Sequence, residues 1–396
     1  HYPLRRQRQM CIRDRDNTLE TFTIPKILNC GHFYSMISDK SIFAVQKTKQ
    51  AIFLGSDIFR GSVYGKGHPL NIARVWPVID ICRAFGWLDD SCFETVAPAS
   101  ASELHLFHSA DYVAALQDAQ THQALDESRR QRHRIGMDNN PIFPQVYDRP
   151  ATAAAASMRG ARYLLEGRYS TVFNPSGGTH HGMPDKANGF CFVNDPALAL
   201  LTLAERPDVK IAYLDIDAHH PDGVQDTLSS HPRIKLWSVH EENRWPRTGQ
   251  PGDNGGGQAR NFTLPRGADD DAFLTVMTHH ILPEIEAFAP DYLVLQAGCD
   301  GLSDDPQSGL MFTTTGYWRS IEICLALAIP TMILGGGGYN PFTTARAWSG
   351  IWGLIAGHSP YKADAPHSVQ DILTSLEWSH RLARSRPDRW VTRLYD

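Results

Sequence analysis

The chain has 396 residues, 42% hydrophobic and 20% charged, with a formal net charge of −5. This is the composition of a globular protein with a large core. It includes neither the Lys/Arg tracts typical of nucleic-acid binding nor the apolar run of about 20 residues that a membrane helix needs. None of the seven cysteines forms a C-x-x-C pair, so we expect reduced thiols, a cytoplasmic location and no cysteine zinc site.

Residues 1–50 show little periodicity. The first 17 residues are strongly basic and have no apolar segment of the kind a signal peptide contains. The stretch MCIRDR (10–15) resembles translated sequencing-adapter read-through, so we expect about the first 16 residues not to be native. We therefore predict an N-terminal extension over 1–50 and one domain over 51–396.

From residue 51 onward, apolar strands alternate with helices. The Ala-rich stretch 149–168 predicts a helix, and Asn194 and Asp195, followed by Pro196, are candidate caps for another. Because the strands are almost continuously apolar, we predict an α/β fold with three layers (α/β/α) and a mostly parallel central sheet. The clearest strands are expected at 171–174, 209–217, 233–240, 291–298 and 329–334.

Polar, titratable side chains follow four of these strands. In parallel sheets, ligands bind beyond the carboxyl ends of the strands, so these side chains are expected to share one site. They are His180 and His181 after the first strand, Asp215, Asp217, His219, His220 and Asp222 after the second, Asp300 after the fourth, and Tyr339 after the last.

The D-x-D-x-H spacing predicts a metal site. Asp217 and His219 are two residues apart, so both can face one ion, and Asp300 can supply a third ligand. Two carboxylates, an imidazole and an open position suit a catalytic Zn²⁺, although Fe²⁺ and Mn²⁺ accept the same atoms. The alternative is that these acids only cap the helices that follow.

The two adjacent histidines His180 and His181 can act as bases. We expect Asp215 and Asp222 to pair with them, fixing the ring tautomers and raising their basicity. Tyr339, which follows four glycines, is a candidate phenol donor to a developing oxyanion, although GGGG alone can also be a tight turn. A second pair, His279–His280, lies mid-helix with no strand end before it, so we expect surface or packing roles there.

Five motifs in order carry a family resemblance: VYGKGHPLNIARV, SGGTHHG…NGFCFVND, YLDIDAHHPDGVQ, QAGCDGLSDDP and LGGGGYNPFTTARAW. From about Ser56 to Gly357 the chain resembles the histone deacetylase superfamily. GMDNNPIFP and SDDP are most similar to its bacterial acetoin-utilisation-type branch. The resemblance implies an arginase/deacetylase fold and zinc-dependent hydrolysis of acetyl-lysine.

The resemblance also assigns roles by position. It implies Asp217, His219 and Asp300 as zinc ligands, His181 paired with Asp222 as general base and acid, His180 paired with Asp215 as an electrostatic partner, and Tyr339 as the group that polarises the carbonyl. It implies a substrate site formed by Phe190, Trp245, Gly189, Gly337, Asp138 and Asn139, with Arg74 in an inner cavity where acetate leaves. It further implies a structural K⁺ held by Asp215, Asp217, His219, Ser238 and Val239.

Three positions depart from the family pattern. Pro221 replaces a usual glycine, Gln307 stands where an apolar residue often lines the pocket mouth, and Asn139 stands where many relatives have an aspartate that neighbouring Asp138 could replace. For Phe190 and Trp245 the alternative is core packing. These departures leave affinity for peptide substrates open.

The expected function is zinc-dependent deacetylation of acetyl-lysine in proteins. One alternative is hydrolysis of small amides such as acetylpolyamines. A ureohydrolase would need the ligands of two metals, and a non-catalytic acyl-lysine binding module would need no base. We expect acetylated substrates as partners, without nucleic acid or membrane, and no pattern indicates an oligomeric state.

Overall fold

The computed structural model describes residues 11–13, 19–21, 51–61, 64–65 and 67–396. The chain divides into two compact units, His1–Thr48 and Lys49–Asp396. In the first unit, β1 (Cys11–Arg13) pairs antiparallel with β2 (Leu19–Thr21). The rest of residues 1–50 lies outside the described residues, and their assignment as an extension stays a prediction.

The second unit is built on an eight-stranded sheet in the order β4-β3-β5-β10-β9-β6-β7-β8. Every neighbouring pair is parallel, which confirms the predicted parallel sheet. The strands are β3 (Ala51–Gly55), β4 (Phe93–Thr95), β5 (Thr171–Asn174), β6 (Ile211–Asp215), β7 (Ile234–Glu241), β8 (Ala259–Leu264), β9 (Tyr292–Gln296) and β10 (Thr331–Leu334).

Alternate strand residues enter two different cores. Leu293 and Leu295 of β9 belong to one hydrophobic cluster, whereas Tyr292 and Val294 belong to the other. Because side chains alternate along a strand, both faces are buried and the strands read as continuous apolar runs.

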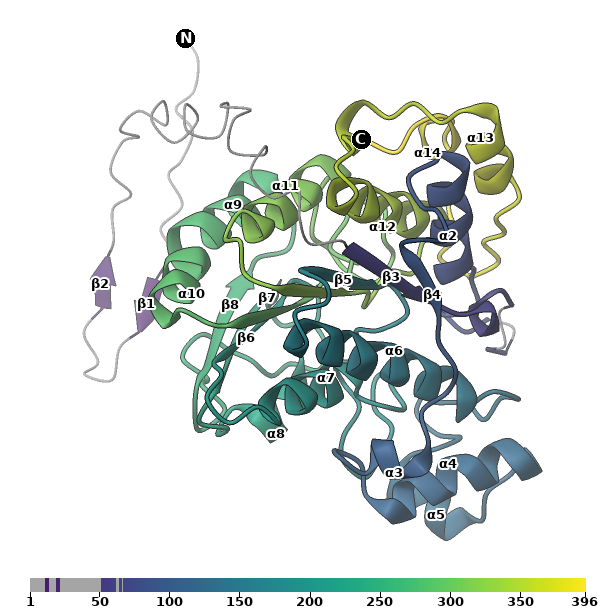
Figure 1. Ribbon diagram of the computed structural model, residues 1–396, viewed down its shortest axis with the longest axis vertical. Helices are drawn as coiled ribbons and strands as arrows, with labels where there is room; N and C mark the ends of the chain where they lie inside the picture. Colours follow the sequence, from purple (N-terminus) through teal and green to yellow (C-terminus); the bar gives the residue numbers. More distant parts are fainter. Residues whose placement is uncertain (1–10, 14–18, 22–50, 62–63, 66) are drawn as a thin grey trace. The chain divides into compact units, whose positions relative to one another are not determined.

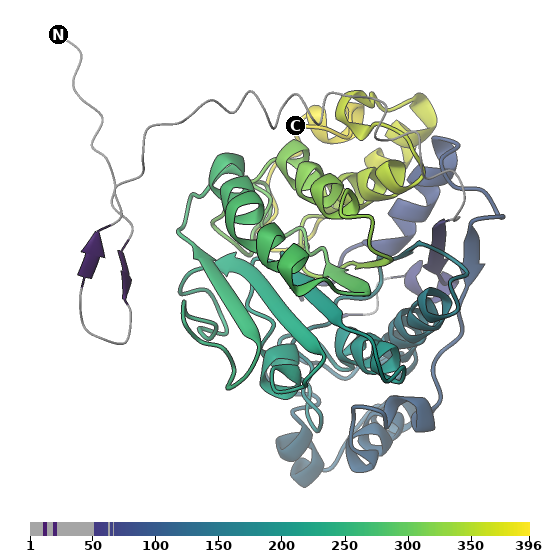
Figure 2. The same ribbon diagram turned by 60° about the vertical axis from the view of Figure 1, so that its left-hand side comes forward.

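Helices cover both faces of the sheet in Figure 1, and the same two helical layers are visible in the rotated view of Figure 2. One face packs under α6 (Asp148–Leu165), α7 (Asp195–Ala204) and α8 (Asp222–Leu228). The other packs under α2 (Val75–Ala84), α9 (Asp270–Val276), α10 (Leu282–Phe288), α11 (Thr314–Leu325), α12 (Pro341–Ile355), α13 (His367–Thr374) and α14 (Arg389–Thr392). This confirms the predicted three layers.

A third, smaller core surrounds helices that precede α6 in the chain. It includes residues of α3 (Ala101–Leu104) and α4 (Ala110–His122), beside α5 (Glu127–His133). Short helical segments complete the fold: η2 (Asp57–Phe59), η3 (Met277–Ile281) and η4 (Pro360–Lys362). Within the described residues, no helix is long and apolar enough to cross a membrane.

Helix starts follow the predicted capping signals in part. The Asn194 side chain accepts a hydrogen bond from the backbone N–H of Ala197 and caps α7. Pro221 sits directly before α8, which begins at Asp222 as expected. Proline has no backbone N–H to leave unpaired at this position, so the helix begins normally.

Candidate active site

The predicted site residues converge beyond the carboxyl ends of β5, β6, β9 and β10, which are neighbours in the sheet. His180 and His181 follow β5, Asp217 follows β6 and Tyr339 follows β10. All four residues line one cavity of about 110 Å³. The expectation that separate strand ends build one site is therefore confirmed.

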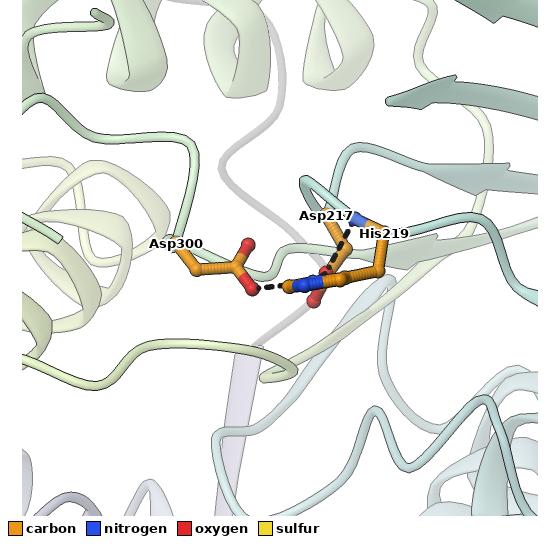
Figure 3. A group of neighbouring side chains, drawn as sticks. All are labelled: Asp217, His219 and Asp300. Atoms are coloured by element: carbon orange, nitrogen blue, oxygen red, sulfur yellow. Dashed lines mark hydrogen bonds and ion pairs between the residues drawn. The ribbon is translucent and has the colours of Figure 1, made fainter. Parts of the chain in front are cut away.

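Asp217, His219 and Asp300 form a compact candidate metal set. Their ligand atoms lie within 4.8 Å of one another, and all three residues are buried. His219 Nδ1 is 3.0 Å from Asp217 Oδ1 and 2.9 Å from Asp300 Oδ2 (Figure 3). Asp300 Oδ2 is buried without a hydrogen-bond partner. Its nearest charged neighbour is His219 Nδ1, a ring nitrogen that can either donate a proton or bind a cation. Two buried carboxylates and an imidazole whose ligand atoms lie this close together fit a divalent cation.

Neighbouring groups fix the orientation of both carboxylates. Asp217 Oδ2 accepts hydrogen bonds from Gly337 N at 2.6 Å and from Gln296 Nε2 at 3.1 Å. Asp300 Oδ1 accepts one from Ala218 N at 2.8 Å. A Cβ at position 337 would lie 2.1 Å from Asp300 Oδ2. Glycine is therefore required there, because the loop backbone approaches the carboxylates too closely for a side chain.

The adjacent histidines form two separate histidine–carboxylate pairs, as predicted. His180 Nδ1 lies 2.7 Å from Asp215 Oδ2, and His181 Nδ1 lies 2.7 Å from Asp222 Oδ1. Tyr213 donates its hydroxyl to Asp215, and Asn188 donates its side-chain amide to Asp222. Each carboxylate is thus held in place and in turn orients one imidazole.

The two rings also contact each other and share a proton. His180 Nε2 and His181 Nε2 are 3.0 Å apart. Because both Nδ1 atoms face carboxylates, a hydrogen bond between the Nε2 atoms requires a proton on one of them, and the pair titrates as a unit.

The surroundings of the two rings shift their pKa values in opposite directions. Although burial opposes it, the carboxylates of Asp215 and Asp217 raise the pKa of His180 to about 9. Burial and the neighbouring charge on His180 lower the pKa of His181 to about 4. These surroundings favour protonation of His180 over His181. The expected rise in basicity therefore holds for His180 but is wrong for His181, where burial and the neighbouring His180 outweigh Asp222.

Tyr339 lines the same cavity with a protonated phenol. Burial, reinforced by Asp300 and Asp217, raises the pKa of its hydroxyl well above the usual value. Its backbone N–H donates to Asp305 Oδ2 at 2.6 Å, and Asp305 Oδ1 accepts from Gln307 N at 2.9 Å. The fully buried Asp305 carboxylate thus ties the Tyr339 loop to the loop that carries Gln307.

Aromatic rings stand beside the histidines. Gly189, Phe190 and Gly337 line the cavity, as the resemblance implied. Trp245 does not line it, but its ring centroid is 4.7 Å from that of His181, and 43% of the residue is exposed. A Cβ on Gly189, whose φ is +52°, would lie 2.4 Å from Trp245.

The remaining predicted substrate residues lie outside this cavity lining. Asp138 forms an ion pair with Arg134. The backbone oxygen of Asn139 is 2.9 Å from His68 Nε2, and the His68 ring contacts Phe190. Arg74 does line the cavity, and its guanidinium donates to Gly336 O and Gly338 O.

The residues expected to hold a monovalent cation are close in the sheet. Asp215 of β6 is the register partner of Ser238 of β7. Asp215 Oδ1 accepts from Asp217 N at 3.1 Å, and Ser238 Oγ bonds to His240 Nδ1. The assignment of Asp215, Asp217, His219, Ser238 and Val239 to K⁺ stays a prediction.

Several supporting residues escaped the sequence reasoning. Asp195, expected as a cap, is buried and accepts hydrogen bonds from Gly178 N and Thr179 N, the two residues before His180. Gln296 and Asp305 hold Asp217 and Tyr339. Only its place as a polar residue at the end of an apolar strand could have pointed to Gln296. Asp195 and Asp305 had no local signal.

The pair His279–His280 has the surface position expected for it, and His108 is a buried histidine outside the site. His279 and His280 lie in η3, are exposed, and have no carboxylate within ion-pair distance among the described residues. His108 is buried and its Nε2 accepts a hydrogen bond from Asn194 N at 3.0 Å. Both observations support structural roles.

A parallel sheet covered on both faces, with a candidate metal site, two histidine–carboxylate pairs and a phenol at its carboxyl edge, is the arrangement of a hydrolase. Comparison with known proteins gives the particular family. Residues 68–355 match the histone deacetylase domain. The chain belongs to the histone deacetylase family.

The relatives include both eukaryotic and bacterial proteins. Histone deacetylase 8 of Danio rerio is 32% identical, over 80% of this chain and 85% of its own length. Acetoin utilization protein AcuC of Bacillus subtilis is 28% identical, over 86% of this chain and 90% of its own length.

The fold matches solved relatives as well. A histone deacetylase homologue crystallised with SAHA has a TM-score of 0.82 and 29% identity, and the alignment covers 88% of this chain and 95% of that one. A homologue from Aquifex aeolicus has a TM-score of 0.83 with 28% identity over the same shares. These matches confirm the α/β fold and the family resemblance.

Proposed function

We propose that this chain is a zinc-dependent deacetylase that hydrolyses the acetamide of acetyl-lysine in proteins and releases acetate. The observation that carries this proposal is that His181, whose pKa is lowered, and Tyr339, whose pKa is raised, line one cavity together with Asp217. A base, a hydrogen-bond donor and a candidate metal ligand face the same space, which is the set that amide hydrolysis needs.

Asp217, His219 and Asp300 would hold the cation, and the closeness of their buried ligand atoms, all within 4.8 Å of one another, is the observation that supports their assignment. A Zn²⁺ in this set supplies Lewis acidity that polarises the carbonyl and eases the deprotonation of water. We also propose K⁺ beside Asp215 and Ser238, where it would stiffen the strand ends that carry these ligands.

The chain's own groups would then move the protons. Asp222 holds the proton on His181 Nδ1, and His181 Nε2, once it exchanges its contact with His180 Nε2 for one with water, accepts a proton from that water. Tyr339 donates a hydrogen bond to the carbonyl oxygen, and the charge on His180 stabilises the developing negative charge. When the C–N bond breaks, His181 returns its proton to the lysine nitrogen. Water has then supplied one hydroxyl to the acyl group and one proton to the amine.

The substrate side of the proposal rests on aromatic rings. Phe190 lines the cavity and Trp245 stands half-exposed against His181. Such rings suit the apolar stem of a lysine whose backbone stays outside the protein.

A turnover panel tests the proposal. The zinc-loaded protein is assayed against acetyl-lysine peptides and acetylpolyamines, alongside Tyr339→Phe and the control Tyr169→Phe, which makes the same change outside the cavity. We expect peptide turnover with a loss of roughly 10²–10³-fold in kcat for Tyr339→Phe only.

Each alternative predicts a different result. Preference for acetylpolyamines would indicate a small-molecule amidohydrolase. Two divalent metal ions per chain would indicate a ureohydrolase. Peptide binding without turnover would indicate a binding module.

A further inference from the structure

Two arginines line the active-site cavity without carboxylate partners. Arg74 stands before α2, and Arg149 lies in the first turn of α6. Among the described residues, neither forms an ion pair. Arg74 donates to Gly336 O and Gly338 O, and Arg149 donates to Ile58 O and Gly61 O. Each guanidinium also lies over an aromatic ring, Arg74 over Trp348 and Arg149 over Phe59, at 5.1 Å from the ring centroid. Carbonyl oxygens and aromatic rings orient a guanidinium but carry no formal charge, so no anion neutralises either cation among the described residues.

The position of Arg149 makes its charge harder to explain as packing. A cation in the first turn of a helix faces the positive end of the helix dipole and is disfavoured there. Burial lowers the pKa of Arg149, and nearby Arg74 lowers it further. Both residues line the same cavity. An anion between them would relieve both effects.

Arg74 contacts the loop beside the candidate metal ligands, and Arg149 lines the same cavity. The carbonyls bound by Arg74 flank Gly337, whose N–H donates to the metal-site residue Asp217. Pro150 and Ala153, which follow Arg149 on α6, also line the cavity. A lysine side chain must lead outward to its peptide, so the acyl group of a substrate occupies the inner part, toward the arginines.

We propose that Arg74 and Arg149 form a carboxylate-binding subsite, so that the enzyme accepts lysine acyl groups that end in a carboxylate, such as succinyl. This inference rests on the proposed function for the outward direction of the lysine. Hydrolysis breaks the same amide C–N bond. Water supplies the hydroxyl of the new carboxylic acid and the proton of the amine, so a dicarboxylate leaves.

A binding experiment tests the subsite without requiring turnover. Calorimetry compares a peptide carrying succinyl-lysine with one carrying succinamoyl-lysine, which has the same shape but ends in a neutral amide. We expect the succinyl peptide to bind the zinc-loaded protein about tenfold more tightly or better, the scale of one charge-assisted hydrogen bond. Equal affinities in the wild-type protein would overturn the proposal.

Variants of α6 locate the effect. Arg149→Gln should bring the affinity ratio close to one, and Arg149→Lys, which keeps the charge, should retain most of it. Arg162→Gln is the matched control, because Arg162 is exposed on the same helix and pairs with Glu103 instead. If Arg149→Gln keeps the full ratio, the assignment is wrong. Thermal unfolding checks that each variant is folded.

Two further results separate this inference from the proposed function. If both peptides bind with the expected ratio but no acyl-lysine is hydrolysed, the subsite stands and the deacetylase proposal fails. Suppose instead that acetyl-lysine is hydrolysed, that Arg149→Gln weakens the binding of free succinate, and that it leaves the affinity for the succinyl-lysine peptide unchanged. The cavity then serves only product release, and the acyl proposal fails.

Discussion

The dipeptide His-His occurs both at 180–181 and at 279–280, and the two pairs have opposite surroundings. The first is buried beyond a strand end, and each ring meets a carboxylate. The second is exposed on η3, a π-helical segment between α9 and α10. The comparison teaches that the residue type gives only the capacity for proton transfer. Burial beside fixed carboxylates decides which ring is charged and which is neutral.

The largest effect is expected from a substitution that removes the proposed base. His181→Ala should lower kcat roughly 10³-fold, within the range of general base catalysis, because no other neutral imidazole lines the cavity among the described residues. His280→Ala, the same change in the exposed pair, should leave kcat unchanged and alter the free energy of unfolding by less than about 0.5 kcal/mol. Steady-state kinetics and denaturant unfolding measure both, and equal losses would break the comparison.

His108 is buried but has no carboxylate partner among the described residues, so it isolates the effect of burial. Burial lowers the pKa of His108 to about 4, whereas the unfolded value is about 6.5. Between these values the unfolded chain binds a proton that the folded chain does not. This residue should therefore lower the free energy of unfolding by up to about 3 kcal/mol as the pH falls through that window.

His108→Gln tests this contribution, because the glutamine oxygen can still accept the hydrogen bond from Asn194 N. The variant should lose about 3 kcal/mol less than the wild type between pH 7 and pH 4. The control is His280→Gln, whose side chain is solvated in both states. Urea unfolding across this pH range gives the difference, and identical acid sensitivity of the variant and the wild type would refute the prediction.

The smallest effect is expected at Asp305, a carboxylate that binds the backbone N–H groups of Tyr339 and Gln307 and, within the described residues, does not pair with a histidine. Asp305→Asn replaces one of the two oxygens that accept from Tyr339 N and Gln307 N with an amide donor. One buried N–H then lacks an acceptor, and we expect a loss of about tenfold in kcat with little change in KM.

Two controls isolate Asp305. Asp304→Asn changes the preceding residue, whose side chain contacts Arg389 and Trp390 instead of Tyr339. In a Tyr339→Phe background the effect of Asp305→Asn should largely vanish, since both act through the phenol. A full tenfold loss in that background would show that Asp305 acts elsewhere.

The amino-acid sequence determined the strands, the parallel sheet and the group of site residues. Continuous apolar runs form strands buried on both faces, and the polar residues that follow them must emerge at one edge. The strand at 171–174 was predicted with its observed bounds, and those at 209–217 and 291–298 proved shorter, ending at Asp215 and Gln296. The residues beyond them are the loops that carry the ligands.

Only the tertiary structure decided which side chains meet. The sheet order β5-β10-β9-β6 brings residues into contact that are more than 100 positions apart in the chain, such as Asp217 and Gly337. The contact between the two Nε2 atoms, the support from Asp195 and Asp305, and the shared cavity of Arg74 and Arg149 all depend on that order. Hydrophobic periodicity specifies which face of a strand is buried, but it carries no information about which strand lies beside it.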